Sequence, residues 1–427
     1  MPWLTLVSRA VRRHGIPLAG TATLLGVFMG MSLWILPAMH HLRGWSYTMD
    51  VWDNFQLGHL ADVGAYPDIY GQAFVETPGI VVALAPVWWI THLAGMSVAY
   101  VVALWHPTAW LVLGPYEVLL SASALFAVDA IAVRLGASVA RRLLICAAEV
   151  FVLYNLVLWG HPEDAVAVVC LLYACLAASQ KRWSRFGWLI GASIAFEPVV
   201  LLTLPPLLLV AGWRRWPGLL ARMAAPTAVL LVLPLTMDWS VTVHGLISQA
   251  TYPSLNRPTP WLRFAPSLGH DGYIGATAIV AAADGPSRLL AILFSVLFGV
   301  LFRRVIKDPG VLIAVVALNL SLWCVFETVI APYYVWPPIA VALIALSTTS
   351  QLRSAATLVF AVIADLASNA DLHAEWVWWV IIAALGALLA ASWPQARARS
   401  REPTAIDAPR EVRTLAVGSL PLTSNDG

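Results

Sequence analysis

The chain has few charged residues for its length. Only 11% of its 427 residues are Asp, Glu, Lys or Arg, whereas 60% are hydrophobic and the mean hydropathy is +0.78. A soluble domain needs more charge than this to cover its surface, so the composition excludes an ordinary soluble protein and indicates that lipid covers much of the chain. The net charge of +2 gives no support to a nucleic-acid partner.

Cysteine is scarce, and the familiar cofactor motifs are missing. The 4 cysteines all lie within apolar runs and form no CxxC pair, so we predict packed thiols rather than disulfides or metal ligands. The sequence contains no GxGxxG, Walker A or HExxH motif and no Cys/His spacing typical of a metal centre. These motifs therefore give no reason to expect a cofactor.

Long apolar runs are abundant, and 21 tryptophans favour membrane–water interfaces. The apolar stretches fall near residues 16–38, 79–105, 107–133, 142–159, 165–180, 186–212, 219–237, 288–304, 310–330, 334–350, 355–370 and 376–393. Runs of this length span about 30 Å of hydrocarbon as helices. The sequence therefore predicts an all-α, polytopic transmembrane helical bundle of about ten to twelve spans over residues 1–393.

Basic residues gather at particular points between these stretches. The clusters are Arg9/Arg12/Arg13, Arg134/Arg141/Arg142, Lys181/Arg182/Arg185, Arg214/Arg215/Arg222, Arg303/Arg304/Lys307, Arg353 and the arginines after residue 396. The positive-inside rule places these clusters and both termini on the cytoplasmic side of the membrane. We expect that this membrane is the cell (plasma) membrane. The tail 394–427 is rich in Pro, Arg, Ser and Thr, and we expect it to be disordered.

Two apolar stretches conflict with this orientation unless they are broken or return to the side where they start. The stretch 186–212 has a basic cluster at each end, so both of its ends must lie on the same side of the membrane. Residues 79–133 run from an outer loop to the inner cluster at 134–142, so they must cross an odd number of times, although they contain two apolar stretches. Pro86 lies inside the first stretch and Glu197-Pro198 inside the second, and proline interrupts helices. We therefore predict ten full spans and two broken or returning segments, with twelve full spans as the alternative.

The extracytoplasmic segments 39–78, 160–164 and 238–286 contain the polar candidates for a site. In the first loop, Asp50 and Asp53 are spaced to share one face of a helix, where they could act as a general base and its partner or bind a cation. The alternative is a solvated loop face. Glu76 precedes a Thr-Pro-Gly turn at 77–79 where the chain re-enters the membrane.

The short segment 160–164 reads Gly-His-Pro-Glu-Asp. One carboxylate of Glu163 or Asp164 could cap the following helix while the other and His161 face a substrate, although both carboxylates could serve only as caps. Asn256 and Arg257 lie in the third segment, and an arginine beside the membrane suits phosphate.

Several carboxylates fall within or at the edge of apolar stretches. Glu197 and Glu327 suggest a functional or paired role because a charge at that depth is costly. Glu327 precedes an aromatic, proline-rich turn with Tyr333 and Tyr334, which is also typical of an aromatic interfacial belt. For Asp129 and Glu149, which lack aromatic neighbours, we expect structural pairing or inward-facing water.

These features resemble the GT-C superfamily of membrane glycosyltransferases, and within it the bacterial, actinobacterial-type polyprenol-phosphate-mannose-dependent α-mannosyltransferases. The resemblance covers most of residues 1–350. It rests on Asp50, Gly64, Tyr66/Tyr70, Thr77-Pro78, Gly-His-Pro-Glu-Asp at 160–164, Phe-Glu-Pro at 196–198 and Phe326 to Pro337. Two positions depart from the family pattern: Glu197 replaces a commoner basic residue, and Thr77-Pro78 replaces Tyr-Pro-Pro.

The resemblance implies transfer of a sugar, mannose in the family, from a polyprenyl-phosphate donor to an extracytoplasmic glycan or glycolipid acceptor, with inversion. Asp50 would be the general base, with Asp53 in support. His161 and Arg257 would stabilise the leaving phosphate, and the lipid would enter near Tyr333 and Tyr334. Neither a metal nor another cofactor is expected, because the leaving group is a lipid phosphate.

Two other functions fit the same sequence. A transporter or lipid flippase would use Asp129, Glu197 and Glu327 as relays within the membrane. A non-catalytic scaffold in envelope assembly would be insensitive to substitution of Asp50 and His161. The long aromatic outer loops and the lack of an internal repeat favour the enzyme.

Overall fold

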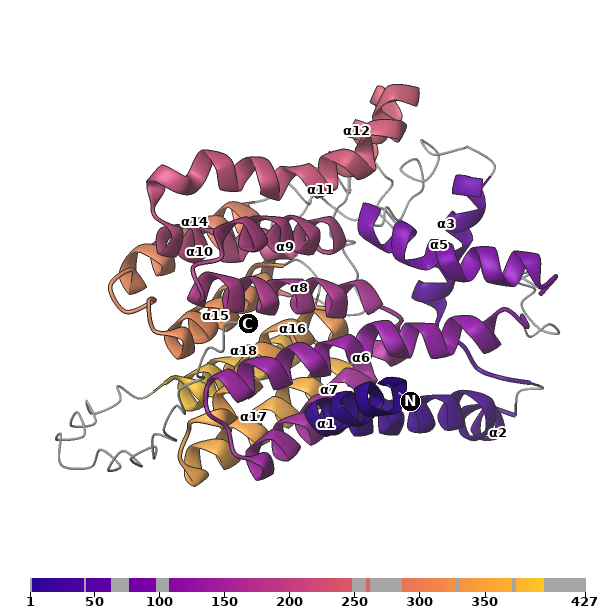
Figure 1. Cartoon of the computed structure of the whole chain (residues 1–427), viewed down its shortest axis with the longest axis horizontal. Coiled ribbons are helices and arrows are strands. Elements are labelled where there is room, and N and C mark those ends of the chain that lie inside the picture. Colours follow the sequence, from indigo (N-terminus) through magenta and orange to yellow (C-terminus); the bar gives the residue numbers. More distant parts are fainter. Residues whose placement is uncertain are drawn as a thin grey trace, which may run out of the picture. The chain divides into compact units, whose positions relative to one another are not determined.

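The computed structural model describes residues 2–41, 44–62, 77–96, 107–247, 259–261, 286–327, 330–370 and 374–394 of the chain. Within these residues every regular element is a helix, so the expected all-α class is confirmed. The chain divides into two units, Met1–Pro394 and Gln395–Gly427, and the helices of the described residues belong to the first unit. Figure 1 labels the helices in chain order.

Among the described residues, 8 helices are long and apolar enough to cross a membrane. They are the continuous run α1 (Pro2–Gly30), η1 (Met31–Ile35) and α2 (Leu36–Met39), followed by α6 (Trp110–Arg134), α7 (Val139–Trp159), α8 (Pro162–Ser179), α11 (Trp216–Met237), α15 (Pro309–Phe326), α17 (Gln351–Asn369) and α18 (Glu375–Ser392). An 18-residue helix is about 27 Å long, close to the hydrocarbon thickness. The chain is therefore a multi-pass membrane protein.

Shorter helices occupy the remaining apolar stretches and the segments beside them. They are α3 (Met49–Asp62), α5 (Pro78–Leu93), α9 (Trp183–Phe196), η2 (Pro198–Thr203), α10 (Leu204–Ala211), η3 (Trp213–Arg215), α12 (Trp239–Ile247), α14 (Pro286–Phe302), α16 (Pro332–Leu343) and η5 (Ile344–Ser347). Helices α8, α9 and α11 lie side by side (Figure 1). Helix α16 packs against α7, α8 and α15.

The segment 186–212 is broken at the predicted place. Helix α9 ends at Phe196, Glu197 has an extended backbone (φ −149°, ψ 109°), and Pro198 begins the tighter turn of η2. The two ends of the segment then meet: the guanidinium carbon of Arg215 lies 5.2 Å from the centre of the Trp183 ring. The two ends of the segment therefore lie close together, as expected of a segment that returns to its starting side.

The other proline does not break its helix, and the predicted break at Pro86 is wrong. Helix α5 runs through Pro86 and ends at Leu93. A proline deprives the carbonyl groups of the preceding turn of their usual partner. The group that loses its donor is the carbonyl of Val82; the neighbouring carbonyl oxygen of Ala83 accepts a hydrogen bond of 2.7 Å from the hydroxyl of Tyr116, which holds α5 against α6 at this point. The rest of the stretch, 97–105, lies outside the described residues.

The turn at 77–79 fixes the start of α5 against the end of α9. The hydroxyl of Thr77 donates to the carbonyl oxygen of Phe196 at 2.6 Å. A methyl group added at Gly79 would lie 2.7 Å from the carbonyl oxygen of Ala195, so only glycine allows this approach. The end of the first loop is thereby held beside Glu197.

Candidate functional site

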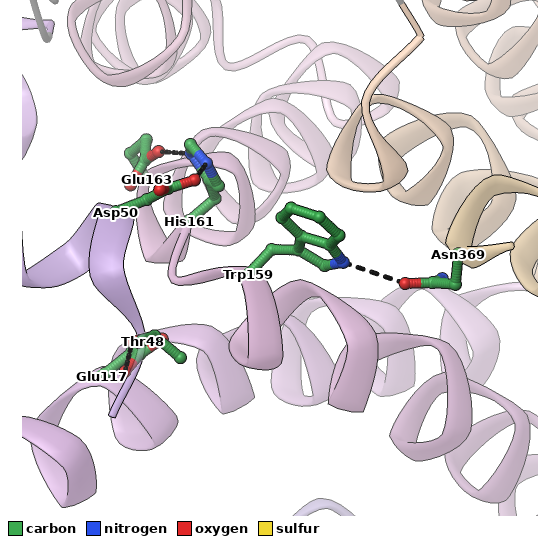
Figure 2. A network of polar contacts seen from close by, with 7 residues as sticks. All are labelled: Thr48, Asp50, Glu117, Trp159, His161, Glu163 and Asn369. Atoms are coloured by element: carbon green, nitrogen blue, oxygen red, sulfur yellow. Dashed lines mark hydrogen bonds and ion pairs between the residues drawn. The ribbon is translucent and has the colours of Figure 1, made fainter. Parts of the chain in front are cut away.

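The central feature of the site is a cluster of three residues from two distant segments, which we call the histidine cluster: Asp50, His161 and Glu163. Asp50 lies in the first turn of α3, while His161 precedes α8 and Glu163 lies in its first turn. The Nε2 atom of His161 lies 2.9 Å from Oδ2 of Asp50, and its Nδ1 atom lies 2.5 Å from Oε1 of Glu163 (Figure 2). Both imidazole nitrogens are therefore bound to carboxylates.

Gly160 allows α3 to approach the turn between α7 and α8. Its backbone is left-handed (φ 82°, ψ 36°), a conformation that favours glycine. A methyl group there would lie 2.7 Å from the backbone nitrogen of Val51 and 3.1 Å from the side chain of Thr48. The preceding Trp159 donates its indole N–H to Asn369 of α17 at 2.9 Å, which anchors the turn from the other side (Figure 2).

The cluster is buried on one side and open on the other. His161 and Glu163 are buried, whereas the side chain of Asp50 is 42% exposed. Burial opposes protonation of His161, but the charge of Glu163 and the hydrogen bonds to Asp50 and Glu163 outweigh it, so the pKa of His161 is raised well above its ordinary value. A histidine held between two carboxylates therefore orients the partly exposed Asp50.

Two tyrosines from the start of α16 complete the wall around His161. The rings of Tyr333 and His161 stack with centroids 3.5 Å apart and an angle of 24°. Tyr334 packs edge-on against Tyr333 at 4.7 Å. The aromatic turn of the sequence thus lies directly against the Gly-His-Pro-Glu-Asp segment, which fixes the plane of the imidazole.

A buried carboxylate that the sequence analysis missed lies behind the cluster. Glu117 of α6 is fully buried, and its Oε2 accepts a hydrogen bond of 3.2 Å from the hydroxyl of Thr48 (Figure 2). The charges that act on it come from Glu163, His161 and Asp50. The signal was available, since Glu117 is an ionisable residue within an apolar stretch, as are Asp129 and Glu149.

A pocket adjoins the cluster on the side of α8 and α16. Its lining residues come from α8, η2, α15, α16 and the break in α9, and they are Asp164, Glu197, Val199, Leu320, Trp323, Tyr334 and Pro337. Glu197 accepts a hydrogen bond from the backbone N–H of Val199 at 3.2 Å. The pocket therefore combines apolar and aromatic walls with two carboxylates.

Arg288 is a second residue that the sequence analysis did not single out for the site. Its guanidinium carbon lies 5.6 Å from the centre of the Trp323 ring, and Trp323 lines the pocket. The residue belongs to α14, next to α15. The available signal was its position, because Arg288 is one of the few arginines outside the basic clusters.

Asp53 and Glu327, which the sequence also predicted for the site, lie outside the histidine cluster. The side chain of Asp53 is exposed at the surface. Partial desolvation of its carboxyl group by neighbouring residues, together with the charge of Asp50, raises the pKa of Asp53. Glu327 is buried at the end of α15, and its carbonyl oxygen accepts a hydrogen bond of 2.7 Å from the hydroxyl of Thr259. Predicted site residues outside the described part of the chain are Glu76, Asn256 and Arg257.

The two carboxylates without aromatic neighbours differ from each other. Asp129 accepts two hydrogen bonds from Arg142, at 2.6 and 2.7 Å, so the expected structural pair is present. Glu149 is fully buried, and neither of its carboxyl oxygens has a hydrogen-bond partner among the described residues. The ion pair between Asp129 and Arg142 therefore holds α6 against α7.

His161, Glu163 and Asp164 are arranged as metal ligands could be. One ligand atom from each of these buried residues lies within 4.8 Å of the others.

Comparison of the chain with family models, with curated proteins and with solved structures finds no match.

Proposed function

We propose that the chain is a membrane glycosyltransferase that moves a hexose, mannose by the family resemblance, from a polyprenyl-phosphate donor to a hydroxyl group of a glycan or glycolipid acceptor. The observation that carries this proposal is the Asp50 carboxylate, which His161 holds at 2.9 Å while 42% of the Asp50 side chain stays exposed. A general base needs both a fixed orientation and access to the proton that it removes.

In the proposed reaction Asp50 takes the proton of the acceptor hydroxyl as the acceptor oxygen attacks the anomeric carbon. The new carbon–oxygen bond forms while the bond from the anomeric carbon to the phosphate oxygen breaks. The electron pair of that bond leaves with the polyprenyl phosphate, and attack from the opposite face inverts the anomeric centre. Proton removal by a positioned carboxylate contributes about 10²–10⁴-fold to such rates.

His161 takes a different role from the one that the resemblance implied. Both of its ring nitrogens are bound to carboxylates, to Asp50 at 2.9 Å and to Glu163 at 2.5 Å. In this arrangement neither nitrogen is available to a leaving phosphate. We therefore assign His161 as a positioning residue that orients Asp50, with Tyr333 fixing its ring.

The proposed donor would bind beside the pocket that adjoins the cluster, with only part of its isoprenoid chain against the pocket walls. Leu320, Val199 and Pro337 give the pocket apolar walls, which suit an isoprenoid chain. Arg288 lies against Trp323 at the same pocket and could contact the phosphate, since a guanidinium matches phosphate oxygens. The sugar would then lie between the pocket and Asp50.

The positive-inside rule supplies the proposed orientation. The turn that carries His161 lies at the opposite end of α8 from the basic cluster at residues 181–185. The cluster side is cytoplasmic under the rule, so the site faces the extracytoplasmic side of the plasma membrane and both termini are cytoplasmic.

A transfer assay with purified protein tests the proposal. Wild type, Asp50→Asn and Asp53→Asn in nanodiscs would receive radiolabelled polyprenyl-phosphate-mannose and a membrane glycolipid extract. We expect transfer by wild type, a loss of about 10²–10⁴-fold in Asp50→Asn, and retention of most activity in Asp53→Asn. Failure of wild type to bind the donor would exclude the proposal, and equal activity in Asp50→Asn would exclude Asp50 as the base.

The transporter alternative makes opposite predictions. It uses Asp129, Glu197 and Glu327 as relays, but Asp129 is held by two hydrogen bonds from Arg142. Transport that depends on the proton gradient and survives Asp50→Ala would support this alternative. A scaffold role requires that substitutions at both Asp50 and His161 have no effect on the phenotype.

A further inference from the structure

We propose that His161, Glu163 and Asp164 bind one divalent metal ion. Their ligand atoms converge within 4.8 Å, and all three residues are buried. The inference needs no donor or acceptor, so it stands or falls separately from the glycosyltransferase activity.

The geometry of His161 fits metal ligation. Its Nδ1 atom lies 2.5 Å from Oε1 of Glu163, a second residue of the same three-residue group. Its Nε2 atom faces Asp50 at 2.9 Å. A metal-binding histidine usually donates its other N–H to a carboxylate, which fixes the ring and the tautomer. A metal on Nδ1 would replace the proton held between Nδ1 and Glu163, which would leave to solvent, and Asp50 would then take that outer role.

An unsatisfied carboxylate oxygen provides the second, independent observation. Oε2 of Glu163 has no hydrogen-bond partner among the described residues, although Glu163 is only 2% exposed. Leaving such an atom buried without a partner is costly, and a cation would satisfy it. Oε1 of the fully buried Glu117 also lacks a partner in the described part of the chain.

The local charge has the sign that attracts a cation. Asp50 and Glu163 both contact a single imidazole, that of His161. The position of Glu163 and Asp164 in the first turn of α8 explains part of this, because a helix N-terminus stabilises carboxylates. It does not account for the unpartnered Oε2 of Glu163 or for the direction of His161 Nδ1.

The ligand set indicates the class of metal. One imidazole nitrogen and two carboxylates suit Zn²⁺ or Mn²⁺ rather than a soft, thiolate-binding ion. Three protein ligands leave at least one coordination position open. An open position beside the pocket that contains Asp164 and Trp323 is accessible to water or to a phosphate oxygen.

Metal binding by the full chain tests the inference directly. Purified protein in detergent would be stripped with EDTA, dialysed and titrated with Mn²⁺ alone or Zn²⁺ alone, with the bound metal counted by mass spectrometry. We expect one equivalent per chain, and electron paramagnetic resonance of the Mn²⁺ form should detect coupling to one imidazole nitrogen. Asp164→Asn and Glu163→Gln should weaken binding by about tenfold or more, and Asp50→Asn by about tenfold.

Glu149→Gln serves as the matched control, because Glu149 is also a fully buried carboxylate but lies on α7, away from the cluster. It should bind the metal as wild type does. Absence of a stoichiometric metal in wild type, lack of nitrogen coupling, or equal affinity in Asp164→Asn would overturn the inference. The measurements on wild type decide the matter even if a variant fails to fold. Transfer by the metal-stripped wild type, without metal binding, would refute the metal site and leave the proposed function intact.

Discussion

The Nε2 atom of His161 lies 2.9 Å from Oδ2 of Asp50, although 111 residues separate them in the chain. This contact joins the first loop to the turn between α7 and α8. Two polar motifs that are separate in the sequence therefore form one site. The same contact explains why Asp50, and not Asp53, is the carboxylate with a fixed orientation.

Replacing Gly160 by alanine should separate α3 from that turn. The left-handed backbone costs about 1–3 kcal/mol for a residue with a side chain, and the added methyl group would also lie 2.7 Å from Val51 N. Gly136→Ala is the control, since Gly136 has a similar φ of 81° and open space around it. Thermal unfolding in detergent should show a larger loss of stability in Gly160→Ala, and equal losses would contradict the close approach.

Thr48→Val should destabilise the protein by leaving the buried carboxyl group of Glu117 without its hydroxyl donor. The hydrogen bond is 3.2 Å long, and loss of a partner for a buried group costs about 1–3 kcal/mol. Thr48→Ser keeps the hydroxyl and should stay close to wild type. Free energies of unfolding from denaturant titration would measure the difference, and indistinguishable values for the two variants would show that the bond contributes nothing.

Arg288→Gln tests the proposed donor phosphate contact. A charge-assisted hydrogen bond contributes about 1.5–3 kcal/mol, so the KM for the polyprenyl-phosphate donor should rise by about 10–100-fold while the KM for the acceptor changes little. Arg353→Gln is the matched control, because Arg353 donates to the carbonyl oxygens of Ala390 and Trp393. An unchanged donor KM in Arg288→Gln would remove this residue from the donor site.

Asp129→Asn should lower the stability of the protein and leave the rate of the transfer reaction unchanged. Asp129 and Arg142 form a nearly buried ion pair at 2.6 Å, and removing one partner of such a pair costs about 3–5 kcal/mol. A double-mutant cycle with Arg142→Met would measure their coupling. Transfer per folded molecule should remain near that of wild type, whereas loss of transfer at full stability would show that Asp129 takes part in the reaction.

Much of the fold follows from local sequence patterns. A membrane helix needs an uninterrupted apolar run to cover its length, so the spans of α6, α7 and α15 are visible from composition alone. The break at Glu197-Pro198 follows from the chemistry of proline. The same rule failed at Pro86, where a hydroxyl from another helix, that of Tyr116, bonds to the preceding turn.

The sequence alone identified Asp50 as a candidate from its spacing relative to Asp53, and His161 and Glu163 from their place together at a helix start. Their meeting depends on Gly160, whose left-handed backbone admits α3 at a distance that no sequence pattern records. The hydrogen bond between Thr48 and Glu117 of α6 likewise joins segments that are far apart in the chain. Sequence determines which segments enter the membrane because that is a property of each segment. Which polar groups become neighbours is decided only by the packing of segments that are far apart in the chain.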